Sequence, residues 1–181
     1  MTTFDHARSL GYDRRATRLL GSLYRRIATD IDAATTPGAT VADIGTGPGK
    51  LLSCLATRRP DLRLHGIDLS PHMIEIARRH LSAHTVELAV ADVTDLPYPD
   101  TSIDLAVSSL SMHEWPDLDP AAHELHRILR PGATLAVYDF RFARTAAVQD
   151  SLRARFGTVE STAIRLPWHP VAVVTRYLAT A

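Results

Sequence analysis

Apolar stretches of strand length alternate with helical patterns along the chain from residue 40 onward. In the helical stretches the apolar residues recur every three or four positions, as on one face of an amphipathic helix. This alternation is typical of βαβ units, which build a parallel sheet covered by helices on both faces. The expected strands are 40–45, 62–69, 86–93, 103–111 and 133–140.

Capping residues and prolines mark the expected helix boundaries. The Ser-Pro pair at 70–71 has the N-cap and first-turn chemistry of a helix over 72–81. The Asp-Pro pair at 119–120 predicts the start of a helix over 121–130, and the Pro-Gly pair at 131–132 is expected to end it.

Two further apolar runs, 161–167 and 171–179, follow near the end of the sequence. Only three residues separate them, too few for a crossover between parallel strands, so they are expected to form an antiparallel hairpin. Residues 1–35 carry leucine and isoleucine at helical spacing, which predicts an N-terminal helical cap. No linker or repeat interrupts the chain, which predicts a single domain over 1–181 with its core at 37–181.

Composition narrows the class of protein. The 181 residues are 45% hydrophobic, enough for one globular core, and the 20 basic side chains balance 20 acidic ones. A balanced charge argues against a nucleic-acid-binding surface, and no apolar run approaches the roughly 20 residues that cross a bilayer. The single cysteine, Cys54, cannot form an internal disulfide, which favours a reducing compartment and predicts a cytoplasmic protein.

A glycine-rich turn, Asp-Ile-Gly-Thr-Gly-Pro-Gly at 43–49, stands where the first expected strand meets the first helix. A dinucleotide fingerprint would need glycine in place of Lys50, and a P-loop would need glycine at Ile44 and a hydroxyl residue at Leu51. Glycines let a ligand approach the backbone closely, while the carboxylate of Asp43 would hold an ammonium group and repel a pyrophosphate. The turn therefore predicts a nucleoside-like ligand with a cationic tail.

This turn and three later segments resemble, in order and spacing, the motifs of the class I S-adenosylmethionine-dependent methyltransferases. The four segments are 41–50, 66–70, 91–109 and 123–140. The resemblance implies an α/β fold, a three-layer αβα sandwich around a seven-stranded, mostly parallel sheet of order 3-2-1-4-5-7-6 whose last strand is antiparallel. It also implies S-adenosylmethionine as the cofactor and S-adenosylhomocysteine as the product.

The resemblance assigns the first two strand ends to the methionine and ribose of the cofactor. Gly45, Gly47 and Gly49 would line both groups, and Asp43 would act through the ammonium group or a nearby water. Asp68, at the end of the second strand, would accept hydrogen bonds from both ribose hydroxyls, as an acidic residue does in dinucleotide-binding folds.

The remaining cofactor assignments concern adenine and the methionine side. Leu69 would pack on the adenine face, Asp92 would accept a hydrogen bond from the exocyclic amine of adenine, and Val93 would lie beneath the ring. Ser108 or Ser109 would lie beside the methionine moiety. All these residues fall at the carboxyl ends of expected strands, where open α/β sheets bind their ligands.

Methyl transfer from a sulfonium depends mainly on positioning, so a general base is optional. His113, after the fourth strand, can deprotonate a hydroxyl or amine near neutral pH. Arg141, after the fifth, can orient a polar substrate, and the topology should bring His169 to the same rim, although a turn without a ligand is an equal alternative there. The histidines at 72, 80, 123 and 126 fall on expected helices, where most should be solvated, and the last two lack a third ligand for a zinc site.

These observations predict methyl transfer to an oxygen, carbon or nitrogen atom of a small organic acceptor by in-line displacement. The chain lacks the motif of base-methylating enzymes and room for the accessory domain of protein methyltransferases. Two alternatives stay open: an S-adenosylmethionine-binding regulatory or partner subunit without transferase activity, and a relative that uses the sulfonium for another reaction. Residues 141–144 are too few for a lid, so residues 1–35, the second subunit of a homodimer, or no segment at all would cover the site.

Overall fold

The computed structural model describes residues 20–141, 145–166 and 171–181. The strands are β1 (Thr40–Ile44), β2 (Arg63–Asp68), β3 (Val86–Val90), β4 (Ile103–Ser109), β5 (Leu129–Phe140), β6 (Val159–Arg165) and β7 (Ala172–Thr180). The helices are α2 (Gly21–Ala34), α3 (Lys50–Arg58), α4 (Pro71–His80), α5 (Leu118–Ile128) and α6 (Thr145–Phe156), with one 3₁₀ turn, η1 (Met112–Glu114). Within these ranges no helix combines the length and apolarity that spanning a membrane requires.

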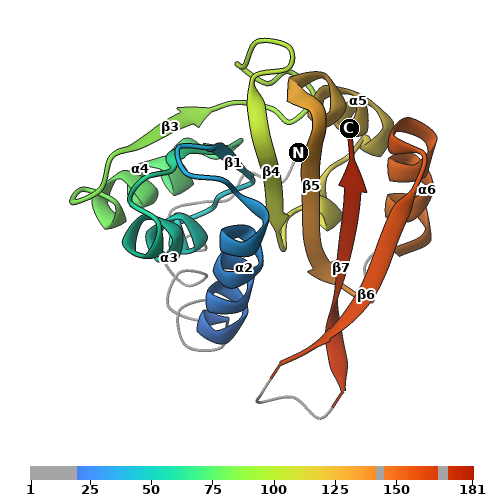
Figure 1. The fold of residues 1–181 in the computed structure, drawn as a ribbon, viewed down its shortest axis with the longest axis horizontal. Coiled ribbons are helices and arrows are strands. Elements are labelled where there is room, and N and C mark those ends of the chain that lie inside the picture. The colour runs from blue at the N-terminus through green and yellow to red at the C-terminus, as the bar shows by residue number, and fades with distance from the viewer. Residues whose placement is uncertain (1–19, 142–144, 167–170) are drawn as a thin grey trace.

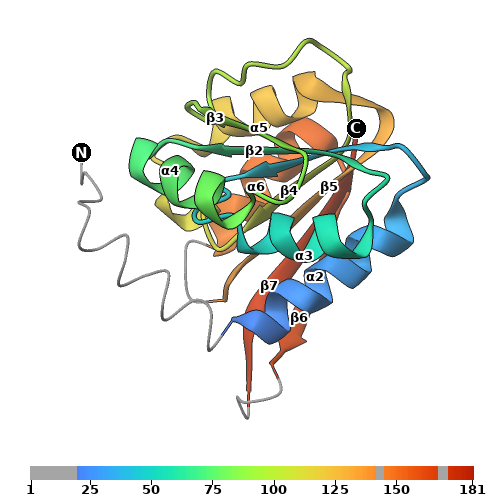
Figure 2. The same cartoon turned by 90° about the vertical axis from the view of Figure 1, so that its left-hand side faces the viewer.

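The strands form one seven-stranded sheet of order β3-β2-β1-β4-β5-β7-β6, with helices on both faces (Figures 1 and 2). Strands β1 to β5 run parallel, and β7 runs antiparallel to both of its neighbours, β5 and β6. The expected fold class, strand order and C-terminal hairpin are confirmed. The carboxyl ends of β1 to β6 therefore share one edge of the sheet, which we call the carboxyl edge.

Two apolar layers hold the sheet between the helices. Side chains of α2, α3 and the end of α4 form one layer, and those of α5 and α6 form the other. Neighbouring residues of β1 divide between them, Val41 in the first layer and Ala42 in the second. A parallel strand covered on both faces buries side chains in both directions, and every residue of β1 is buried. This is why an apolar run identified the strand.

The boundaries of α5 and β5 differ from the expectation. The helix begins at Leu118, so the Asp-Pro pair at 119–120 lies inside its first turn and does not cap it. Leu118 is buried, and proline is tolerated in a first turn, where the N–H groups have no helical partner. The Pro-Gly pair at 131–132 lies within β5, where the Gly132 N–H donates to the carbonyl of Ala181 at 2.8 Å. Burial and strand pairing therefore override the two local signals.

Helix α2 forms part of the segment expected to cap the domain. Its Leu23, Ile27 and Ile31 are buried in the layer on the sheet, and its Asp30 accepts a hydrogen bond from the Tyr138 hydroxyl at 2.9 Å. This part of the chain is thus an outer-layer helix that packs beside α3 (Figure 2). The expected cap over residues 1–19 lies outside the described residues.

Candidate functional site

The glycine-rich turn after β1 crosses the end of β2 and leads into α3. The N–H of Gly45 donates to the carbonyl of Ile67 at 2.8 Å, and the N–H of Gly47 donates to the carboxylate of Asp68 at 2.9 Å. Gly45, Gly47 and Gly49 have positive φ angles of 75°, 52° and 75°, which glycine adopts without a steric cost. The end of β2 therefore holds the turn in a shape that depends on its glycines.

The three glycines differ in their surroundings. A Cβ atom on Gly45 would lie 2.5 Å from the Cβ of Ser111, and one on Gly49 would lie 2.9 Å from a methyl group of Leu81. A Cβ on Gly47 would meet nothing within 4 Å. Packing inside the protein explains the first and third glycines, whereas Gly47 presents an open side to a ligand.

We expect Gly45→Ala to destabilise the fold and Gly47→Ala to weaken ligand binding with little loss of stability. Alanine at position 45 would have to adopt a left-handed backbone conformation, and its Cβ would clash with the Cβ of Ser111. Together these two effects should lower the free energy of unfolding by about 2–4 kcal/mol. Alanine at 47 costs about 1 kcal/mol for the backbone alone. Chemical denaturation with and without S-adenosylhomocysteine measures both effects, and equal destabilisation by the two substitutions would contradict this distinction.

Asp43 lies under the turn and has no exposed surface. Its Oδ2 accepts a hydrogen bond from the Thr46 hydroxyl at 2.8 Å, and its Oδ1 has no hydrogen-bond partner among the described residues. Burial raises the pKa of this carboxyl from 3.8 to about 7. A side chain without exposed surface is touched neither by a ligand's ammonium group nor by solvent water, so both expected roles of Asp43 stay predictions.

Asp68 ends β2 beside the turn. Its carboxylate oxygens accept hydrogen bonds from the backbone N–H groups of Gly47 at 2.9 Å and Ser70 at 2.8 Å. Burial raises the pKa of this carboxyl, and the two N–H groups lower it again in part. Each carboxylate oxygen can accept a second hydrogen bond, so the half-buried Asp68 can receive two hydroxyl groups of a ligand. The Ser70 hydroxyl caps α4, which leaves Asp68 outside that role.

Apolar side chains flank this carboxylate. Leu69 is 62% exposed, and Val90, paired in register with Asp68 at the end of β3, is 47% exposed. Val93, expected beneath adenine, is buried in the layer with α5, and the exposed Asp92 accepts a hydrogen bond from the backbone N–H that follows Val93 at 2.9 Å. The exposure of Val90 was not predicted, because β3 ends three residues earlier than expected.

These groups fit the ribose and base of a nucleoside. Asp68 can accept hydrogen bonds from the hydroxyls of a ribose, and the open side of Gly47 lets the ribose approach the backbone closely. Leu69 and Val90 provide exposed apolar surface against which a nucleobase can pack. Within the described residues, no three histidine, cysteine or acidic side chains gather as a metal site would need. The groups at this edge therefore fit the nucleoside part of S-adenosylmethionine, while the role of each residue stays a prediction.

The chain leaves β4 through a left-handed residue. Leu110 has a φ angle of 57°, and its N–H donates to the carbonyl of Tyr138 at 2.7 Å. The Ser111 hydroxyl then lies 2.8 Å from that of Ser108 and donates to the Ile44 carbonyl at 3.1 Å. Backbone strain of this kind is common at functional sites. Because Ser108 is fully buried, a ligand at this point would meet Ser111 first.

A histidine–aspartate pair lies where β4 and β5 end. The backbone N–H of His113 donates to Asp139 Oδ2 at 2.7 Å, and its Nδ1 lies 2.8 Å from Asp139 Oδ1. Because a carboxylate only accepts, Nδ1 carries the proton and Nε2 is the nitrogen that can act as a base. The hydrogen bond to Asp139 raises the pKa of His113, against the opposing effect of burial.

The sequence did not predict the contact between Asp139 and His113. The contact arises because Ser109, the last residue of β4, pairs with Tyr138, which places Asp139, the next residue of β5, beside the chain that leaves β4. Adjacency of the fourth and fifth strands was expected, but the register that aligns their ends depends on packing and cannot be read from an apolar run.

Of the other two expected catalytic residues, the structure describes Arg141 but not His169, and it shows Phe140 between His113 and Arg141 in the sequence. The Phe140 ring contacts the His113 ring edge-on, with 5.5 Å between centroids. Arg141 follows at the same edge. Its backbone N–H donates to the carbonyl of Val173 at 3.0 Å, and its guanidinium donates to the carbonyl of Ala172 at 3.3 Å. The structure thus brings Phe140 to His113 and places Arg141 against the start of β7. Residue His169 lies outside the described residues.

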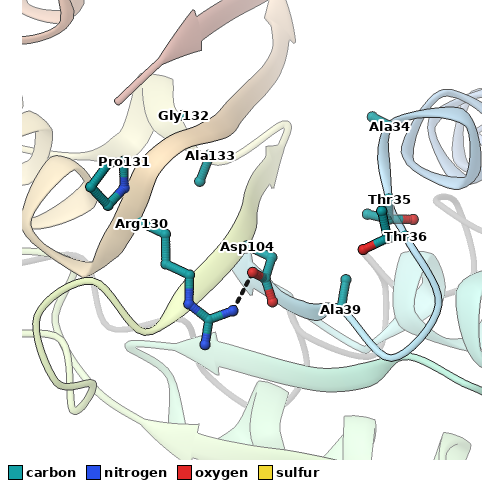
Figure 3. A pocket seen from close by; sticks show the side chains of 9 residues that line it. All are labelled: Ala34, Thr35, Thr36, Ala39, Asp104, Arg130, Pro131, Gly132 and Ala133. Carbon is teal, nitrogen blue, oxygen red and sulfur yellow. Dashed lines mark hydrogen bonds and ion pairs between the residues drawn. The ribbon is translucent and has the colours of Figure 1, made fainter.

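A depression of about 240 Å³ lies at the opposite edge of the sheet, beside the amino ends of β1 and β4 (Figure 3). Its charged residues, Asp104 and Arg130, form an ion pair with each other, and Asp104 also accepts the N–H of Thr40 at 2.8 Å. Both charges are therefore satisfied within the protein. Open α/β sheets bind ligands at the carboxyl ends of their strands, so the carboxyl edge remains the candidate site.

Comparison with known proteins relates this chain to methyltransferases. The sequence profile of a family described as a methyltransferase domain matches residues 42–137. The demethylmenaquinone methyltransferase of Thermus thermophilus is 34% identical over 119 residues, which are 65% of this chain and 54% of that protein. The arsenite methyltransferase of Halobacterium salinarum is 31% identical over 127 residues, 67% of this chain and 32% of that protein.

Among solved structures, a TehB-like S-adenosylmethionine-dependent methyltransferase from Corynebacterium glutamicum matches with a TM-score of 0.78. Its sequence is 21% identical, and the match covers 97% of this chain and 99% of that one. The chain spans about half the length, or less, of the two curated relatives above. The matched profile covers more than half of the chain, and the chain therefore belongs to the class I S-adenosylmethionine-dependent methyltransferases.

Proposed function

We propose that this chain transfers a methyl group from S-adenosylmethionine to an ionisable hydroxyl group of a small organic acceptor. The observation that carries the proposal is the pair of His113 and Asp139, 2.8 Å apart, at the same edge as the glycine-rich turn and Asp68. An imidazole held by a carboxylate is a base suited to a hydroxyl group that ionises near neutral pH.

Bound S-adenosylmethionine supplies a methyl group activated by a positively charged sulfur. The residues of the chain do the rest. Asp68 and Gly47 orient the nucleoside, and Nε2 of His113 accepts the proton of the acceptor hydroxyl. Asp139 holds the ring in the correct tautomer and balances the positive charge that the ring gains. General-base assistance of this kind contributes about 10²- to 10⁴-fold in rate, and positioning of the two reactants contributes the remainder.

Apolar side chains on the acceptor side support an acceptor with an apolar body. Phe140 is 36% exposed beside His113, and Val171, directly before β7, is 53% exposed. Together with Leu69 and Val90 these are the exposed large apolar side chains of the described residues, and all four lie along the carboxyl edge. Exposed apolar side chains at the edge where open α/β sheets bind their ligands suit a ligand with apolar parts.

We expect Phe140→Ala to raise the KM for an apolar acceptor roughly 5- to 30-fold, because an aromatic contact of about 1–2 kcal/mol is lost. The affinity for S-adenosylhomocysteine should stay unchanged, since Phe140 lies on the acceptor side. Steady-state kinetics with a matched pair of apolar and polar acceptors measures the effect. An equal change in KM for both acceptors would contradict an apolar contact between Phe140 and the acceptor.

The balanced charge of 20 basic and 20 acidic residues supports a small-molecule acceptor over nucleic acid. The two curated relatives, named for demethylmenaquinone and arsenite, also point to small molecules, but to very different ones. The single cysteine supports a cytoplasmic location.

A panel of apolar phenols and enols, incubated with the protein and S-adenosylmethionine, tests the proposal by mass spectrometry. We expect a product heavier by one methylene group and an equal amount of S-adenosylhomocysteine. Product without S-adenosylhomocysteine would indicate a non-methylating reaction, and cofactor binding without turnover of any acceptor would favour a regulatory subunit.

A further inference from the structure

We propose that His80 is a positioning residue for the cofactor turn. From the end of α4 it holds the second half of the turn, Pro48 and Gly49, in the shape that binds S-adenosylmethionine. This inference rests on the proposed function, because it takes the turn at 45–49 as the cofactor site.

The contact is a hydrogen bond from the imidazole to the backbone of the turn. His80 Nδ1 lies 2.8 Å from the carbonyl oxygen of Pro48, and because a carbonyl only accepts, Nδ1 is the donor. The other ring nitrogen, Nε2, lies 3.5 Å from the ammonium nitrogen of Lys50, the one lysine in the sequence. One half-buried ring thus touches the residues on both sides of Gly49.

The second half of the turn needs this support more than the first. The first half is held from outside by the end of β2, through Gly45 and Gly47. In the second half, Gly49 N–H donates to a carbonyl of the turn itself, and the Gly49 carbonyl accepts the N–H of Ser53 in α3 at 3.0 Å. The carbonyl of the buried Pro48 accepts from a side chain of α4, and a buried carbonyl without a donor is costly.

Packing at the same place supports the assignment. Ala77 and Leu81, one turn before and one residue after His80, stand so close to Gly49 that an added Cβ would lie 3.2 Å and 2.9 Å from them. Helix α4 begins at its Ser70 cap, beside Asp68, and ends on the turn. The helix therefore connects the ribose acceptor to the glycine-rich turn as a rigid spacer.

Substitutions that keep or remove the donor separate this role from simple packing. Asparagine places its amide nitrogen near the position of Nδ1, whereas glutamine places it near Nε2, and leucine removes it. We expect His80→Leu and His80→Gln to weaken S-adenosylhomocysteine binding roughly three- to tenfold, the loss of one hydrogen bond. His80→Asn should stay within about twofold of the native protein.

Calorimetric titration of the four proteins with S-adenosylhomocysteine tests the inference, with His123→Leu on the exposed side of α5 as the matched control. Amide hydrogen exchange at Gly49 gives a readout independent of the ligand, and it should be faster in the leucine and glutamine variants only, whereas exchange at Gly47, whose N–H is held by Asp68, should stay unchanged in all of them.

Equal affinities for the asparagine and glutamine variants, or unchanged exchange at Gly49 in the glutamine variant, would overturn the role of His80. The comparison of these two variants decides the matter even where the leucine variant does not fold. Failure of the native protein to bind S-adenosylhomocysteine would instead contradict the proposed function, so the two failures are distinguishable.

Discussion

Replacing Asp68 with alanine is expected to lower the affinity for S-adenosylhomocysteine at least about 100-fold, because hydrogen bonds to a charged acceptor contribute about 1.5–3 kcal/mol each. The side chain is half-buried and already accepts two backbone N–H groups, so it is held ready for two hydroxyl groups. The unfolding free energy of the unliganded protein should fall by much less than the binding free energy, since the two backbone N–H groups can donate to water when the carboxylate is removed.

Calorimetry measures the effect of Asp68→Ala, with Asp150→Asn on the exposed side of α6 as the control for a lost carboxylate. A ligand that lacks one ribose hydroxyl completes a thermodynamic cycle. We expect this ligand to bind more weakly than the parent to the native protein but equally to the Asp68 variant. A loss of equal size in both proteins would show that the hydroxyl has another partner.

Replacing His113 with asparagine is expected to lower kcat by about 100-fold or more while the affinity for the cofactor product stays unchanged. Asparagine can keep the donor toward Asp139 near the position of Nδ1, so the turn after β4 should keep its shape. It has no counterpart of Nε2 and so cannot accept the proton. Single-turnover kinetics at saturating cofactor separates this loss from a loss of binding.

The dependence of kcat on pH should also show that His113 acts as the base. His113 acts as a base only when it is neutral, and the hydrogen bond to Asp139 raises its pKa above the ordinary value. The rate should therefore rise with pH along a limb centred above about 6.5, the ordinary histidine pKa. Asp139→Asn should move this limb to lower pH and lower the rate, whereas a limb at the same pH in the variant would mean that another group titrates.

The parts of the fold that could be predicted are those that local pattern determines. β1 and β4 are covered on both faces and bury nearly every residue, so their apolar runs stand out. The glycine-rich turn could be read from its spacing, because Gly45, Gly47 and Gly49 all occupy left-handed conformations that other residues avoid.

The parts that could not be predicted depend on contacts between distant segments. The pairing of His113 with Asp139 follows from the register of β4 and β5, and the exposure of Val90 follows from where β3 ends. His80 is one of four helix histidines most of which were expected to be solvated, but it lies against the turn because α4 packs its last residues on Gly49. Register and helix packing are set by the whole core, so neither is visible in a local pattern.

A crystal structure of the protein grown with S-adenosylhomocysteine would show directly whether the cofactor binds at the carboxyl edge. We expect the ligand at the carboxyl edge, with its ribose hydroxyls on the carboxylate of Asp68, the open side of Gly47 against it and its base against Leu69. Ligand bound at the opposite edge between Asp104 and Arg130, or a phosphate-bearing compound seated on the glycine-rich turn, would contradict this expectation.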